Sequence, residues 1–257
     1  MPGENNAAVE YALDGTIARI TLNRPEKRNA LNDDLITGVR EALRRADHNE
    51  DVRAVILSGA GSDFCSGADL AALQKMSTAT VAENLEDARS LMELFLLIRA
   101  VRVPVISAVR GRALAGGCGL ALACDLALAS RSARFGFPEV KIGFVPAMVM
   151  AILRRNTSEK RAFELLTLGT EIGAEEAAAY GLVNKVLDDD AFDDELDVFA
   201  HQFDRVSSSA VSLSKRLLYA GDAMSFRDAL ECGVDTNVIA RMAEDCRKGI
   251  ERFLQKS

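Results

Sequence analysis

The sequence lacks features that several large classes of protein require. It has 31 Lys and Arg against 38 Asp and Glu, a formal net charge of −7, so it has no cation excess for nucleic acids or anionic membranes. No apolar run approaches the roughly 20 residues of a membrane span. The first ten residues, MPGENNAAVE, lack the charged start and apolar stretch of a leader peptide. We therefore expect a cytoplasmic protein without nucleic-acid or membrane partners.

The five cysteines also lack the spacing of a metal site. They form no CxxC pair, and Cys65, Cys118 and Cys124 lie in apolar or glycine-rich stretches. Such surroundings favour reduced, buried thiols over disulfides or a metal cage. We expect no metal ligands.

What is present is the length and the alternation of an α/β protein. The chain has 257 residues, 49% of them hydrophobic, enough for a sizeable core. Alternation and apolar runs predict strands at 9–22 (a hairpin around Asp14-Gly15), 52–57, 104–109, 125–130, 133–137 and 182–187. Capping signals and periodicity predict helices at 32–46, 80–99, 147–155, 158–168 and 174–180, and throughout from Asp189. The change from alternating strands and helices to helices alone predicts a core over residues 1–200 and a helical oligomerisation region over 201–257.

The stretch ALAGGCGLALACD, residues 113–125, carries no charge before its last residue. Gly116 and Gly117 stand where a strand passes into a helix, so the amides of residues 116–119 are expected to be the unpaired donors of the first turn. The helix dipole and the missing side chains would let a ligand oxygen approach these donors. A glycine-rich packing turn without a ligand is the alternative.

A second glycine-rich turn, GAGSDFCSGADL at 59–70, follows the strand at 52–57. Its amide at Ala68 and that of Gly116 could together hold one oxygen as an oxyanion hole. The turn lacks the third glycine of GxGxxG, and the chain has no GxxxxGK, so neither a dinucleotide site nor a P-loop is indicated.

Nucleophilic catalysis is not favoured either. Cys65 and Ser66 could serve as nucleophiles, but a triad needs a histidine. The chain has two histidines. His48 lies in a polar helix end and His201 in the predicted C-terminal helices.

Five ordered motifs carry a family resemblance over nearly the whole chain. They are TLNRPEKRNALN (21–32), FCSGADL (64–70), ALAGGCGLALACDLALAS (113–130), FGFPEVKIGFVP (135–146) and GLVNKV (181–186). Together they resemble the crotonase superfamily, the enoyl-CoA hydratases and isomerases. The resemblance implies an α/β spiral of repeated β-β-α units with a C-terminal α-helical trimerisation region. It also implies assembly as a homotrimer or as a hexamer made of two trimers.

The resemblance further implies an acyl-CoA thioester as substrate, with coenzyme A as part of that substrate and no permanently bound cofactor. The thioester oxygen would lie between the amides of Ala68 and Gly116. The residues implied in coenzyme A binding are Lys27, Arg28, Ala30, Ala68, Asp69, Leu70, Ala71 and Gly116. Independently of the family, the cations around Lys27 and Arg28 suit phosphates, although a solvated turn would have the same composition.

The catalytic carboxylate is the point at which the chain departs from the hydratases it resembles. Those enzymes use two glutamates, because adding water needs both activation of the nucleophile and protonation of a carbon. Glu139 matches the second, but Gly119 stands at the position of the first. An exposed carboxylate after a turn proline is the alternative for Glu139. Its apolar flanks instead favour a desolvated group with a raised pKa, suited to proton abstraction.

A single carboxylate facing an oxyanion hole predicts Δ3-Δ2-enoyl-CoA isomerisation, with Glu139 moving a proton between two carbons. In place of the glycine-rich run of hydratases the chain has Ala147, Met148 and Val149, which should narrow or reshape the acyl pocket. The aspartate of dienoyl-CoA isomerases and the aspartate and histidine of the dehalogenases have no match. We also expect that Gly119→Glu would raise hydration if space at the helix start permits.

Three other functions stay open from the sequence. One is a 2-enoyl-CoA hydratase for straight or branched substrates, helped by a second carboxylate from the helix at 80–99. The candidates there are Glu83, Glu86, Asp87 and Glu93, most of which are expected on a solvated face. Another is a non-catalytic acyl-CoA-binding homologue. A peptidase on a related spiral fold is the third, and the shortage of histidines counts against it.

Overall fold

The structure is a computed structural model that describes residues 8–255, and the expectation of no leader falls largely on residues 1–7, outside the described part. Its main sheet has the strand order β1-β2-β3-β4-β6-β9. These strands are β1 (Val9–Asp14), β2 (Ile17–Leu22), β3 (Ala54–Gly59), β4 (Val105–Val109), β6 (Leu126–Ser130) and β9 (Lys185–Leu187). The predicted hairpin is confirmed, but its two-residue loop is Gly15-Thr16 and not Asp14-Gly15, because Asp14 still pairs with Ile17; Gly15 has φ +59°. All other neighbours in this sheet are parallel.

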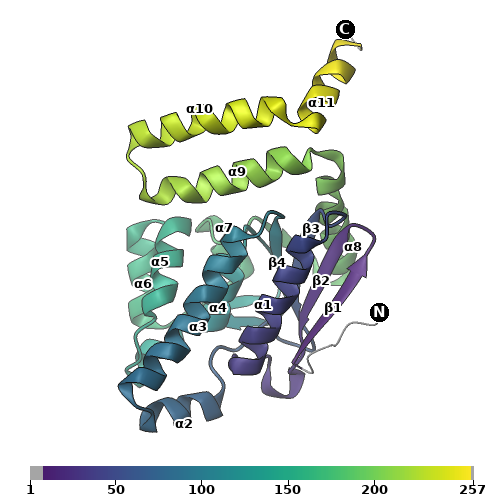
Figure 1. Ribbon diagram of the computed structural model, residues 1–257. Coiled ribbons are helices and arrows are strands. Elements are labelled where there is room, and N and C mark those ends of the chain that lie inside the picture. Colours follow the sequence, from purple (N-terminus) through teal and green to yellow (C-terminus); the bar gives the residue numbers. More distant parts are fainter. Residues whose placement is uncertain (1–7, 256–257) are drawn as a thin grey trace.

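Helices connect the strands and form the C-terminal region (Figure 1). They are α1 (Asp33–His48), α2 (Leu70–Thr78), α3 (Val81–Ala100), α4 (Gly116–Ala123), α5 (Ala147–Asn156), α6 (Glu159–Leu168), α7 (Ala174–Ala179), α8 (Phe192–Ala200), α9 (Ser208–Ala220), α10 (Phe226–Met242) and α11 (Glu244–Leu254). Two predicted starts are confirmed by their caps. Asn32 accepts the amide of Leu35 at 3.0 Å, and Thr80 and Glu83 form a capping box.

A second, three-stranded sheet positions the candidate site. It consists of β5 (Arg112–Leu114), β7 (Arg134–Gly136) and β8 (Glu171–Gly173), in the order β5-β7-β8. The sequence analysis missed β5, β8 and α2. The two strands have only three residues each, too few to show a period, and α2 buries none of its side chains, so it has no apolar stripe to detect.

The C-terminal helices are fastened to the core by a buried lysine. Lys215 of α9 donates to Asp125 at 2.7 Å and to the carbonyls of Ile98 and Val103, while the Tyr219 hydroxyl donates to the other oxygen of Asp125. Burial lowers the pKa of Lys215, although the Asp125 carboxylate opposes that shift. Figure 1 shows α9 and α10 side by side at one end of the molecule.

The predicted fold class is confirmed, an α/β architecture with a helical C-terminal region. The division into residues 1–200 and 201–257 stays a prediction. Among the described helices, none is long and apolar enough to cross a membrane.

Candidate active site

The two predicted oxyanion donors follow segments that pair in parallel. Cys65 forms a parallel bridge with Ala113, and the amide of Leu114 donates to the carbonyl of Cys65 at 2.9 Å. Ala68 and Gly116 each lie three residues beyond the bridged position. Parallel segments that start in register reach the same edge together, so the pairing carries both residues towards one place.

The turns that carry these donors touch. A Cβ placed on Gly67 would lie 2.7 Å from the Cβ of Ala115, which leaves no room for a side chain. Ala115 itself has φ +53°, a conformation that L-residues other than glycine rarely adopt and that often marks functional sites. Within residues 8–255, neither the amide of Ala68 nor that of Gly116 has a hydrogen-bond partner. Both N–H groups are available to a ligand oxygen.

Helix α4 confirms most of what its sequence predicted and corrects one detail. Seven of its eight residues are buried, as expected for a dry helix body. The amide of Gly119, however, donates to the carbonyl of Ala115 at 3.0 Å. The prediction of unpaired amides over 116–119 is therefore wrong at Gly119, because the carbonyl of the residue preceding a helix already accepts the first intrahelical bond.

Glu139 follows the strand that pairs with β5. Leu114 and Gly136 are partners in the β5–β7 ladder, and the amide of Ala115 donates to the carbonyl of Gly136 at 2.8 Å. Three residues further on, Glu139 lies in a short 3-10 helix, Pro138–Ile142. Its Oε2 atom is buried and has no hydrogen-bond partner among the described residues. Burial raises the pKa of this carboxyl group, as its apolar flanks led us to expect.

The space beside Gly119 is already filled. A Cβ at this position would lie 2.6 Å from Cγ2 of Val149 and 3.4 Å from Cζ of Phe95. Val149 comes from α5 and Phe95 from α3, and both are buried. The condition attached to Gly119→Glu, that space permits, is not met in the folded chain.

The basic turn predicted to bind coenzyme A presents its cations to solvent. Lys27 and Arg28 are exposed, whereas Ala30 is buried. The turn is held by Asn29, a fully buried side chain that the sequence analysis did not single out. Its amide nitrogen donates to the carbonyls of Ala60 and Asp63 at 2.8 and 2.7 Å. Residues 28 and 29 have positive φ values, which asparagine tolerates better than most residues, so the asparagine within this turn was the available sequence signal.

The other predicted binding segment begins α2. Asp69 accepts the amide of Ala71 at 2.8 Å and forms an ion pair with Arg24 at 2.6 Å. These contacts, the Arg24 guanidinium first among them, lower the pKa of Asp69. Leu70 is 82% exposed. Asp69 thus acts as a structural cap here, while Leu70 and Ala71 face outwards.

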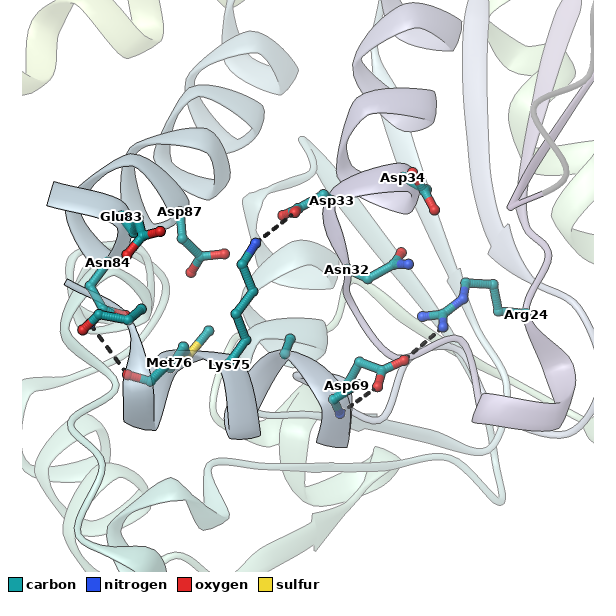
Figure 2. A pocket seen from close by; sticks show the side chains of 13 residues that line it. Arg24, Asn32, Asp33, Asp34, Asp69, Lys75, Met76, Glu83, Asn84 and Asp87 are labelled. Carbon is teal, nitrogen blue, oxygen red and sulfur yellow. Dashed lines mark hydrogen bonds and ion pairs between the residues drawn. The ribbon is translucent and has the colours of Figure 1, made fainter. Parts of the chain in front are cut away.

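A polar cavity of about 310 Å³ borders this segment between α1, α2 and α3. Figure 2 shows Lys75 reaching from α2 towards Asp33, with Arg24 and Asp69 paired on the other side. The cavity is lined by Arg24, Asn32, Asp33, Asp34, Asp69, Ala71, Ala72, Lys75, Met76, Ala79, Glu83, Asn84 and Asp87. Two predicted binding residues, Asp69 and Ala71, belong to this lining. The three predicted catalytic residues do not, so the cavity lies next to the candidate active site.

Comparison with known proteins identifies the family. The family model described as "Enoyl-CoA hydratase/isomerase" matches residues 13–257. The chain belongs to the enoyl-CoA hydratase/isomerase family. Its crotonase-type fold agrees with the resemblance found in the sequence.

Curated and solved members of this family cover nearly the whole chain. A Thermus thermophilus protein named "Putative enoyl-CoA hydratase" is 38% identical over 242 residues, 94% of this chain and 96% of the relative. The crystal structure of an enoyl-CoA hydratase from Mycobacterium smegmatis has a TM-score of 0.92 at 31% identity, covering 97% of this chain and 96% of its own. Human enoyl Coenzyme A hydratase domain-containing protein 3 has a TM-score of 0.91 at 29% identity, covering 97% and 98%.

The groups needed for nucleophilic catalysis are placed unfavourably in this family member. The Cys65 thiol is fully buried, which raises its pKa to about 12, so it is not an available nucleophile. The Nδ1 atom of His48 contacts the carbonyl of Arg44 at the end of α1. That of His201 lies 2.8 Å from Asp204. Neither imidazole contacts Cys65 or Ser66.

The possible second carboxylates of α3 mostly serve other roles. Glu83 belongs to the capping box, Glu86 is exposed, and Glu93 pairs with Arg40 at 2.6 Å. Asp87 alone of these four is partly buried, and burial raises its pKa, with a further contribution from Asp33. It lines the neighbouring cavity. No group of three or more His, Cys, Asp or Glu within residues 8–255 is arranged to hold a metal ion.

Proposed function

We propose that this family member is a Δ3-Δ2-enoyl-CoA isomerase with Glu139 as its proton carrier. The observation that carries the proposal is the buried, unpartnered Oε2 of Glu139. Glu139 lies in the short helix that follows β7, and β7 pairs with β5, the strand that leads to Gly116. A carboxylate with one unpaired oxygen and a raised pKa is a better base for carbon acids than an exposed one.

The proposed reaction conserves all atoms of the substrate. The Glu139 carboxylate removes a proton from C2 of a 3-enoyl thioester, and the electron pair moves onto the thioester oxygen. The amides of Ala68 and Gly116 hold this oxygen as the enolate forms. Glu139 then returns the proton to C4, and the double bond moves from C3–C4 to C2–C3. Donors placed in advance around a developing oxyanion are commonly the largest single contribution to such rates.

Coenzyme A is proposed as the carrier part of the substrate, not as a resident cofactor. Lys27 and Arg28 are exposed cations on an otherwise acidic protein, which suits phosphate groups. The Leu31–Ala68 bridge joins two adjoining segments. One contains Ala30, and the other contains Asp69, Leu70 and Ala71. A ligand that lies along this bridge would reach the two oxyanion donors with its thioester.

Hydration of a 2-enoyl-CoA is the second candidate. It is favoured by the names of relatives, such as the enoyl-CoA hydratase of Mycobacterium smegmatis. A second carboxylate at Gly119 is missing, and Asp87 on the neighbouring cavity is the partly buried alternative. A non-catalytic acyl-CoA-binding protein is the remaining alternative, and the buried Oε2 atom and raised pKa of Glu139 argue against it.

The deciding experiment offers the purified protein 3-enoyl-CoA and 2-enoyl-CoA side by side, detects isomerisation by the ultraviolet absorbance of the conjugated 2-enoyl thioester, and detects hydration by the gain in mass. We expect the 3-enoyl ester to isomerise with no mass change and the 2-enoyl ester to gain water at least tenfold more slowly. Hydration at a rate comparable to isomerisation would refute the isomerase assignment. Binding of both esters without turnover would support the non-catalytic alternative.

We further propose assembly as a homotrimer or as a hexamer of two trimers. Support comes from a stripe of side chains on α10, each more than half exposed: Phe226, Leu230, Val234, Val238 and Met242. Because a spacing of four residues advances about 40° around the helix at each step, these five side chains cover about 160°, just under half of its circumference. The proposed place in metabolism is fatty acid breakdown or synthesis in the cytoplasm, although a relative from Danio rerio is named as mitochondrial.

A further inference from the structure

The atoms nearest to the side-chain positions of Gly116 and Gly119, at the start of α4, are all carbon. A Cβ on Gly116 would meet Cδ1 of Leu31 at 3.0 Å and Cδ2 of Leu91 at 3.9 Å. One turn further along the same face, a Cβ on Gly119 would meet Val149 and Phe95. Leu91 and Phe95 are four residues apart on α3, so one face of α3 follows one face of α4.

Such a wall cannot hold a reactive water molecule. A bound water needs two to four polar partners, and the side chains nearest the Gly116 and Gly119 positions supply none. A water-holding group would have to project from the α4 face next to the oxyanion donor. Gly119 is the position on that face one turn after Gly116, and its outward space belongs to Val149.

Val149 is also unable to move aside easily. It is 4% exposed and lies in α5, which packs against α4. β-branched side chains in helices hold one strongly preferred rotamer. A contact of 2.6 Å to Cγ2 would therefore require a shift of the helix rather than a rotation of the side chain.

We infer that Val149 is a specificity-determining residue, whose methyl groups fill the volume next to Gly119 and exclude both a water molecule and a carboxylate from the acyl side of the oxyanion hole. The inference rests on the proposed isomerase function. It extends that function by stating that hydration is prevented by packing from α5 as well as by the missing glutamate. Restoring a glutamate alone is then insufficient.

The functional test compares four proteins: the unmodified chain, Gly119→Glu, Val149→Gly and the double variant. We expect hydration of 2-enoyl-CoA to rise at least tenfold in the double variant and to stay unchanged in both single variants. A further double variant, Gly119→Glu with Val149→Ile, keeps the space filled with apolar atoms and should gain no hydration. The inference is overturned if Gly119→Glu alone gains as much hydration as the Gly119→Glu/Val149→Gly protein, or if that double variant folds and gains none.

A thermal measurement tests the packing independently of any activity. Gly119→Ala should lower the Tm by about 3–8 °C, since overpacking outweighs the better helix propensity of alanine. In a Val149→Ala background the same change should leave the Tm unchanged or raise it. If Gly119→Ala lowers the Tm equally in both backgrounds, the inference is overturned, even where the glutamate variants fail to fold. Failure of the proposed isomerase function would show itself separately, as an unmodified protein that does not isomerise 3-enoyl-CoA.

Discussion

Helices α4 and α10 are both rich in apolar residues, but they differ in what covers them. Seven of the eight residues of α4 are buried within the chain, whereas none of the 17 residues of α10 is buried. The partners of α4 are α3, α5, the strand β5 of the small sheet, and the strands β4 and β6 of the main sheet. Helix α10 packs against α9 and α11, but each side chain of its apolar stripe stays more than half exposed in the described chain. The difference teaches that apolar content alone does not locate a core, and that each helix must be matched to a partner.

The largest expected effect comes from the carboxylate that accompanies α4. Glu139→Gln keeps the size of the side chain but removes the base, so isomerisation should fall by about 10³-fold or more. Steady-state rates with 3-enoyl-CoA check this, together with binding of an acyl-CoA. Glu159→Gln, at an exposed carboxylate on α6, is the matched control and should be neutral. Unchanged turnover in the Glu139 variant would show that Glu139 is not the base of the reaction.

The second effect separates the amide at the start of α4 from the space around it. Gly116→Pro removes the N–H donor, and proline is tolerated at a first helical position. Gly116→Ala keeps the donor, although both variants place a Cβ 3.0 Å from Leu31. We expect the proline variant to lose about 10² to 10³ in kcat and the alanine variant less than about tenfold. Equal losses in both would mean that sterics, not the hydrogen bond, control the rate.

The third prediction concerns α10. Val234→Glu places a charge in the middle of the exposed apolar stripe and should reduce the particle mass in solution from an oligomer to a monomer. The control, Val81→Glu, places the same charge on an exposed valine at the start of α3, away from the stripe, and should leave the mass unchanged. Mass by light scattering after size exclusion measures both. A monomeric unmodified protein would contradict the proposed assembly and leave the stripe of α10 without its proposed partner.

The smallest effect is the pH dependence of activity and stability that follows from the partly buried carboxyl group of Glu139. Because burial raises the pKa of Glu139 above its usual 4.5, activity should decline on the acid side with a midpoint above that value. Folding favours the protonated form of Glu139. The resulting stabilisation is present below the pKa that Glu139 has in the unfolded chain, and it is lost as the pH rises through the higher pKa of the folded state. Glu139→Gln should then raise the Tm by about 1–3 °C at pH 8, with the difference vanishing near pH 4. A constant Tm difference across this range would show that Glu139 titrates normally.

Local signals were sufficient for much of the fold. The Asn32 cap, the Thr80 and Glu83 capping box and the hairpin at Gly15 were all predicted and found. Each depends on residues within a few positions of one another. The strands β5 and β8 were missed because three residues carry no readable period. Their partners come from distant parts of the chain, so only the folded structure defines them.

The candidate site divides in the same way. Glu139, the glycine turns and the absence of a glutamate at Gly119 were readable from the sequence and its family resemblance. The unpaired amide at Gly119 was a wrong prediction, because an intrahelical bond uses it. Asn29, which holds the basic turn through hydrogen bonds to the carbonyls of Ala60 and Asp63, was not recognised, since these partners lie more than 30 residues away.

The sequence by itself determined which residues are available for chemistry: one carboxylate after Pro138, two glycine turns, and no histidine near either. These are properties of residue type and local spacing. Only the tertiary structure decided that Cys65, Ala113 and Phe135 lie side by side, so that the segments following them reach one edge. It also decided that Val149 occupies the space next to Gly119. Both depend on contacts between residues distant in sequence, whose geometry is fixed by strand register and helix packing.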